Sequence, residues 1–319
     1  MKRLLVGGLG RLGDAGLFAP PLAVLLGFAV PPLAMLGHAL LVPCVVILLA
    51  MSMGLAEPGR IGRAEWPPVL LLAACNLIAT PLLVHAIAQR LGMADAGGWL
   101  VLVASCPLAG GAALVASLLR LPVRPVLLAQ LLCFFALPLT APLIARLVLP
   151  DAVVSPLALF CRVLLMVGLP ALLGYAIRRW LGERRRLVFA RPMRGLGVLG
   201  LCGVGLSIAA GLPRLDLATP AWGAALAGLS LASLTGAALG MLAAAVVARR
   251  MLLGFALGGA VRNVSLLWSA TLGLAPPEGE LVMMLGILWT LLLPALLELR
   301  PGRLVLFGRA LALAARRGS

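Results

Sequence analysis

Acidic residues are scarce in this chain of 319 residues, which has ten Asp and Glu against 26 Lys and Arg, and only two His. All ten acidic residues fall in predicted loops or at predicted helix ends, so the apolar segments contain no carboxylate for a proton relay. The sequence has no His and Glu cluster, nucleophile motif or phosphate-binding loop, which argues against an enzyme. The six cysteines stand singly, without a Cys-x-x-Cys pair, so they are predicted to be buried free thiols. No cofactor is expected.

Hydrophobic residues, by contrast, make up 63% of the chain, and the mean hydropathy is +1.14. They form unalternating runs of about 20 residues, the length that a membrane-spanning helix needs. The net charge is +16, but the basic residues lie between the apolar runs rather than on one soluble face. The composition therefore predicts an all-α membrane protein in contact with the lipid bilayer, and no nucleic-acid partner.

Ten apolar segments are predicted to span the membrane, at about residues 17–30, 38–55, 67–88, 99–119, 125–149, 155–177, 195–211, 221–247, 251–274 and 280–297. With the N-terminus in the cytoplasm, 21 of the 26 basic residues lie on the cytoplasmic side, seven of them in a predicted loop at 178–194. Because basic loops favour the cytoplasmic side, both termini are predicted to be cytoplasmic, in a bacterial inner membrane. Within the basic tail at 300–319, residues 303–317 are predicted to form an interfacial helix against anionic lipid.

Two of these segments carry helix-weakening residues in their middle. The fourth contains Pro107 followed by Gly110 and Gly111, and the ninth contains Gly258 and Gly259. Proline removes a backbone hydrogen bond, and glycine lowers helix stability. Both segments are therefore predicted to be discontinuous helices.

The positions of these two breaks indicate an internal repeat. Each falls in the fourth segment of a five-segment half, the halves covering about 15–149 and 155–298. An odd number of spans per half makes the second half inverted relative to the first. Paired interruptions at corresponding positions of inverted halves are typical of the midplane site of a secondary transporter.

The ninth segment also carries a charge in its middle, Arg262, followed by Asn263. A charge at that depth normally faces the interior of the bundle or a wet cavity. A half-helix that begins near Asn263 would point its amides inward, where they and the guanidinium attract an anion. The alternative is a straight helix whose arginine pairs with a carbonyl. The predicted substrate-binding residues are Arg262, Asn263, Gly110, Gly111, Pro107, Gly258, Gly259, Asn76, Gln130 and Ser265.

Several stretches resemble the bile acid:sodium symporter family and its bacterial relatives. They are MSMGLAEPG (51–59), NLIATPLL (76–83), the stretch 101–128 with LPLTAPLI (137–144), and AVRNVSLLWSA (260–270). The resemblance extends along nearly the whole chain. It implies ten helices in one transmembrane domain over 1–319, with a panel of helices 1, 2, 6 and 7 and a core of helices 3–5 and 8–10. It also implies that helices 4 and 9 cross at their unwound middles.

The chain departs from the family at the positions that hold sodium, which here read Ala112, Ala113, Val126, Gln130, Gly258 and Arg262, and Asn76 stands where the family has a glutamine. Sodium needs several oxygen ligands, whereas arginine offers only donors. A guanidinium that stays protonated is therefore predicted to replace the charge of bound sodium.

The expected function is secondary transport of small organic anions by alternating access, independent of sodium. Two alternatives stay open: a sodium-coupled organic anion symporter that uses other ligands, and a non-transporting membrane sensor or scaffold that kept the fold. The sequence does not indicate the oligomeric state.

Overall fold

The computed structural model describes residues 2–14, 16, 18–56, 62–109, 123–149, 154–212, 221–247 and 251–298. Within these ranges the secondary structure is helical, apart from turns, short extended segments and one isolated bridge between Leu108 and Arg262. Four helical segments in the same ranges are long and apolar enough to cross a membrane, or five if one pair bent by 120° counts as a single span. The prediction of an all-α, membrane-embedded protein is confirmed.

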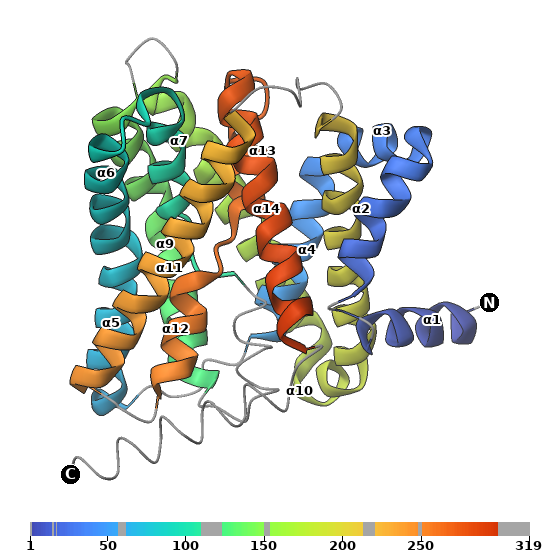
Figure 1. The fold of residues 1–319 in the computed structure, drawn as a ribbon. Coiled ribbons are helices and arrows are strands. Elements are labelled where there is room, and N and C mark those ends of the chain that lie inside the picture. Colours follow the sequence, from blue (N-terminus) through green and yellow to red (C-terminus); the bar gives the residue numbers. More distant parts are fainter. Residues whose placement is uncertain are drawn as a thin grey trace.

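The helices form two groups that stand side by side, with two further helices between them (Figure 1). The first group contains α1 (Lys2–Asp14), α2 (Ala19–Ala29), α3 (Pro31–Ala39), α4 (Leu41–Leu55) and α10 (Pro156–Gly211). The second contains α5 (Trp66–Ala74), the π-helix η2 (Cys75–Ala79), α6 (Thr80–Arg90), α7 (Ala94–Ala104), α9 (Val123–Val148), α11 (Ala221–Val247) and α12 (Leu252–Ala260). Between them lie α13 (Val264–Thr271) and α14 (Pro277–Glu298).

Most predicted segments agree with the observed helices to within a few residues, as α2, α9, α11 and α14 do. The prediction that the second helix begins at about residue 38 is wrong, because α3 already starts at Pro31 and continues after Leu40 into α4. Prolines fit the first turn of a helix, where their missing N–H has no intrahelical partner. The basic segment before the first span forms the separate helix α1.

The prediction of a loop at 178–194 is also wrong, because this stretch is helical on both sides of Gly182. Arginine, leucine and glutamate dominate the stretch and are good helix formers. Gly182 has φ 64° and ψ 174°, a conformation that glycine adopts without steric strain. One residue therefore divides α10 into two limbs, residues 156–181 and 183–211.

The two limbs of α10 run in opposite directions along α4. At the end of α4, Gly54 lies against Ile177 of the first limb and Met193 of the second. Near its start, Cys44 lies against Gly200 and Gly203 of the second limb. A Cβ built on Gly200 would stand 2.6 Å from the backbone oxygen of Cys44, so this helix pair needs glycine for its close approach.

Hydrophobic packing joins the two groups at one end and leaves them separate at the other. The largest cluster of buried side chains includes Leu41 of α4, Val204 of α10, Phe134 of α9 and Trp268 of α13. Toward the opposite end the buried side chains form two further clusters. One is formed mainly by α5, α9, α11 and α12, with Leu77 of η2 and Leu108, and the other consists of Ala50, Met51 and Met193 with their neighbours.

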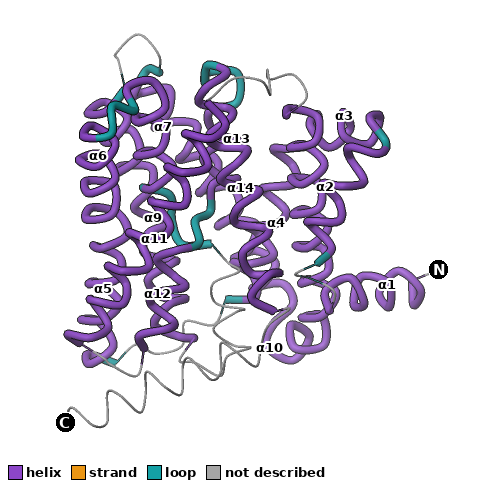
Figure 2. Tube along the Cα trace, in the orientation of Figure 1, coloured by secondary structure: helices purple, strands orange, loops and turns teal. Residues whose placement is uncertain are grey.

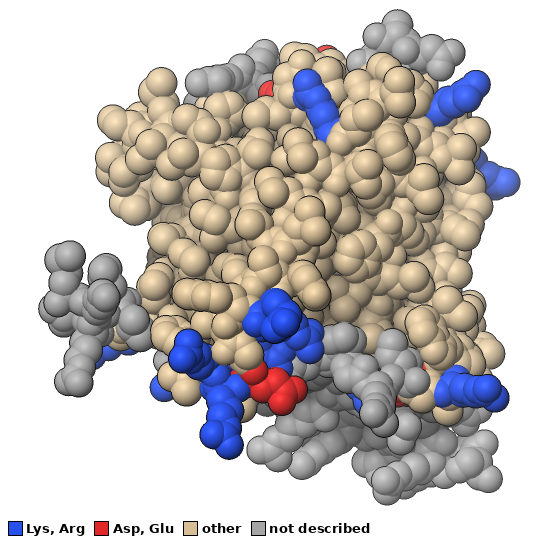
Figure 3. Space-filling model, turned by 180° about the vertical axis from the view of Figure 1, so that it is seen from behind, with Lys and Arg blue, Asp and Glu red and all other residues tan. Residues whose placement is uncertain are grey.

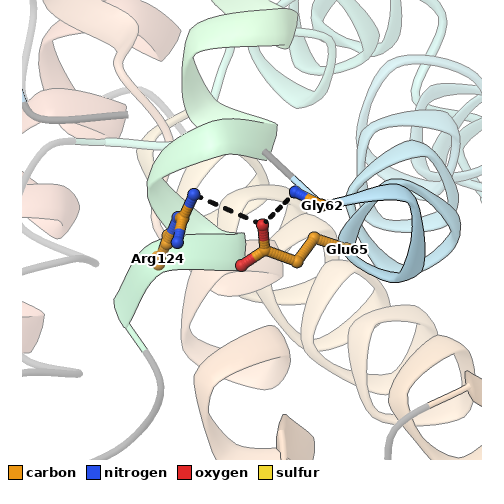
Figure 4. Close-up of polar contacts among 3 residues, drawn as sticks. All are labelled: Gly62, Glu65 and Arg124. Carbon is orange, nitrogen blue, oxygen red and sulfur yellow. Dashed lines mark hydrogen bonds and ion pairs between the residues drawn. The ribbon is translucent and has the colours of Figure 1, made fainter. Parts of the chain in front are cut away.

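Charged residues lie mainly at the end where the clusters are separate. Figure 3 shows a middle band free of Lys and Arg on the visible face, with basic residues gathered at the lower end and a few at the upper end. At the lower end Glu65 accepts a hydrogen bond from the backbone N–H of Gly62 at 2.9 Å and pairs with Arg124 at 3.3 Å (Figure 4). This pair links the 3₁₀ turn η1 (Arg63–Glu65), just before α5, to the start of α9. The tail at 300–319 lies outside the described residues.

Candidate functional site

The first helix break follows α7, which ends at Ala104. The Ser105 hydroxyl donates to the carbonyl of Leu102 at 2.7 Å, and the chain then continues without helical hydrogen bonds from Pro107 to Ala109. Proline has no N–H to continue the helix. The predicted interruption near residue 107 is therefore present, and it begins slightly earlier than expected.

The second break lies between α12 and α13, at residues 261–263. It pairs with the first break in antiparallel fashion, and the teal segments at the centre of Figure 2 show where the two meet. The N–H of Asn263 donates to the carbonyl of Pro107 at 2.7 Å, and the N–H of Ala109 donates to the carbonyl of Val261 at 3.0 Å. These bonds satisfy backbone groups that the two helix ends leave free, and they lock the breaks together.

The Arg262 side chain leaves this crossing toward η2. Its Nη1 donates to Oδ1 of Asn76, to the backbone oxygen of Asn76 at 3.3 Å, and to that of Cys106 at 3.5 Å. Asn76 Nδ2 in turn donates to the Cys106 carbonyl at 3.0 Å. Asn76 sits in a π-helical turn, a distortion that is frequent at functional sites. The guanidinium thus ties η2 to both breaks.

The remaining guanidinium nitrogens of Arg262 are enclosed. The side chain is 5% exposed, and Nε and Nη2 are buried without a hydrogen-bond partner among the described residues. Helix α11 covers this side, because a Cβ on Gly236 would stand 2.5 Å from Nη2 and would also overlap the carbonyl of Gly259. Arg262 therefore carries a charge that faces the helices rather than open space.

A cavity of about 430 Å³ lies between the two helix groups, beside the crossing. The first turn of α13 forms part of its wall through Asn263, Val264 and Ser265. The Ser265 hydroxyl donates to Asn263 Oδ1 at 2.9 Å, and no side chain caps the start of α13. Free N–H groups at a helix start attract anions. Further polar lining comes from Ser52, Gln130, Arg194 and Thr290, and the other lining residues are mostly apolar.

The structure brings most of the predicted site residues to one region. Asn263, Ser265 and Gln130 line the cavity. Pro107 accepts a hydrogen bond from the N–H of Asn263, and Asn76 donates one to the Cys106 carbonyl beside the first break. Arg262 also lines it, although its Nε and Nη2 are turned into the helices.

The glycines of the ninth segment have a packing role. Gly258 lies against Leu108 and Val126, and Gly259 lies against Gly236. Val126 is fully buried in the apolar cluster of α5, α9, α11 and α12. The predicted residues Gly110 and Gly111, and the sodium-site positions Ala112 and Ala113, lie outside the described residues.

Two residues that line the cavity were not predicted from the sequence. Thr290 donates to the carbonyl of Arg262 at 3.0 Å and lines the cavity. The sequence feature that could have identified Thr290 is its hydroxyl in the otherwise apolar stretch 281–297. Arg194 was placed in a predicted loop, but it belongs to α10 and lines the cavity.

No family model and no curated protein matches this chain.

Proposed function

We propose that the chain is a secondary transporter that carries small organic anions across a bacterial inner membrane by alternating access, without sodium. One observation carries the proposal, the antiparallel pairing of two helix breaks at Leu108 and Arg262 beside a cavity of about 430 Å³. That volume lies in the range of small-molecule sites. Crossed discontinuous helices that present a half-helix N-terminus to a cavity suit an anionic substrate.

The proposal includes ten spans in two inverted five-helix repeats, with both termini in the cytoplasm. In this arrangement α2–α4 and α10 form the panel, and the remaining helices after α4 form the core. The cavity reaches Arg194 and Met193, close to the end where the basic residues gather. The opposite ends of the two groups share one apolar cluster. These observations support a conformation open to the cytoplasm.

Sodium independence is supported by the contact between Asn76 and Arg262. Arg262 stands at a position that resembles a sodium-site position of the family, and Asn76 stands where the family has a glutamine. The side-chain oxygen of Asn76 accepts a hydrogen bond from the Arg262 guanidinium and is therefore engaged by a cationic group of the protein itself. A sodium ion about 4 Å from that charge, at an effective dielectric constant near 20, would meet a repulsion of roughly 4 kcal/mol. Such a repulsion lowers affinity nearly a thousandfold.

The test is uptake of a panel of carboxylates and sulfonates into proteoliposomes, with thermal stabilisation of the purified protein by the same anions. At least one anion should stabilise and enter, to the same extent in sodium and in choline buffers. Uptake that requires sodium would support the sodium-coupled symporter instead. Stabilisation without uptake would support the sensor.

A matched pair of variants tests the location of the site. Ser265→Leu places a bulky side chain in the cavity wall and should abolish uptake. Gly168→Leu adds the same side chain to α10 at a position where a Cβ would meet nothing within 4 Å, and should leave uptake unchanged. Equal uptake by the two variants would place the site elsewhere.

A further inference from the structure

One face of the second limb of α10 looks into the cavity. Arg194, Gly197, Val198 and Leu201 all line it, at the spacing of residues that share one side of a helix. Met193, which also lines the cavity, and Arg194 come first along this limb, on the side of Gly182. Arg194 therefore lines the part of the cavity on the Gly182 side of this limb.

Arg194 differs from Arg262, the other arginine that lines the cavity. Arg262 is 5% exposed, with Nη1 bound to Asn76 and the other two nitrogens buried. The side chain of Arg194 is exposed and makes no hydrogen bond or ion pair within the described part of the chain. Of the two arginines that line the cavity among the described residues, Arg194 is thus the one whose guanidinium is accessible to a solute.

We propose that Arg194 forms an anion-capturing subsite for carboxylates or sulfonates at the cytoplasmic mouth of the cavity. A guanidinium binds either group through two parallel hydrogen bonds. An unpaired cation at the mouth of a cleft also raises the local concentration of anions and lowers that of cations. This inference rests on the proposed transport of anions and assigns the first contact to α10 rather than to the helix breaks.

The subsite is tested without knowledge of the substrate by measuring the charge selectivity of the cavity. Val198→Cys introduces a thiol one helical turn from Arg194, on the same face. Its modification is followed by mass spectrometry of the peptide, with sulfonatoethyl methanethiosulfonate as anionic reagent and the trimethylammonium analogue as cationic reagent. In the V198C background, R194Q should lower the ratio of anionic to cationic modification rates about fivefold, since one charge acts oppositely on the two reagents at this range.

Two controls isolate the charge. R194K keeps a positive charge and should keep the ratio of the V198C chain. R185Q removes an exposed arginine of α10 that does not line the cavity, and should also leave the ratio unchanged.

If R194Q leaves the ratio of modification rates unchanged, the proposed subsite is overturned. Transport is then still decided by the uptake experiment. A thiol at position 198 that reacts with neither reagent means that the cavity is closed to solutes, and overturns both proposals. A ratio that falls as expected in a chain that takes up no anion keeps the subsite and removes transport.

Discussion

Replacing Asn76 with leucine removes the side chain that joins Arg262 to the first helix break. The Asn76 amide accepts a hydrogen bond from Arg262 and donates one to the Cys106 carbonyl at 3.0 Å. A hydrogen bond to a charged group contributes roughly 1.5–3 kcal/mol and a neutral one about 1 kcal/mol. Asn76→Leu should therefore destabilise the folded protein by about 2.5–4 kcal/mol.

The matched control is Gln89→Leu, which makes a similar change at an exposed position of α6. Both variants are compared with the parent by thermal unfolding in detergent, followed by tryptophan fluorescence. The unfolding midpoint of Asn76→Leu should fall by several degrees, whereas that of Gln89→Leu should stay near the parent value.

A double-mutant cycle then tests the physical reason. The single change at Asn76 leaves a buried guanidinium poorly bonded, whereas the double variant Asn76→Leu with Arg262→Met removes both partners. Replacing both members of a buried pair with apolar groups is far less destabilising than removing one. The double variant should be more stable than Asn76→Leu alone. Additive losses from the two changes would refute the argument that these side chains act as a pair.

Three further predictions concern other parts of the fold. Gly236→Ala should lower the unfolding free energy by about 1–3 kcal/mol, because its Cβ would overlap the backbone of α12; Gly223→Ala, in open space on the same helix, should not lower it. Reporter fusions at Gly182 should lie in the cytoplasm and fusions after Leu274 on the opposite side, because the proposed topology puts 21 of the 26 basic residues on the cytoplasmic side; a shared side would overturn the ten-span arrangement. Glu65→Gln should change the unfolding free energy by less than about 1 kcal/mol, since its ion pair with Arg124 is partly exposed, and high salt should make this change smaller. A larger loss in the same unfolding assay would contradict this.

The sequence alone determined the class of protein and the places where its helices break. Hydrophobic runs of membrane-spanning length define the helices, because backbone groups in lipid must be satisfied within the segment. Pro107 marked the first break, since proline acts on the local backbone whatever surrounds it. Gly258 and Gly259 marked the neighbourhood of the second break, but they lie within α12 and the break follows at residues 261–263. The charge of Arg262 within an apolar segment marked it as a residue that faces the interior.

Only the tertiary structure decided how these pieces meet. Local pattern did not show that α10 reverses at Gly182, because the many arginines around it resemble those of a polar loop. Nor did it show where the guanidinium of Arg262 points, since an extended residue between two helices can turn to either side. Its direction is fixed by the acceptors of Asn76 and Cys106 and by the close packing of α11. The cavity and the place of Arg194 in its wall likewise arise from helices far apart in the chain, which sequence periodicity cannot relate.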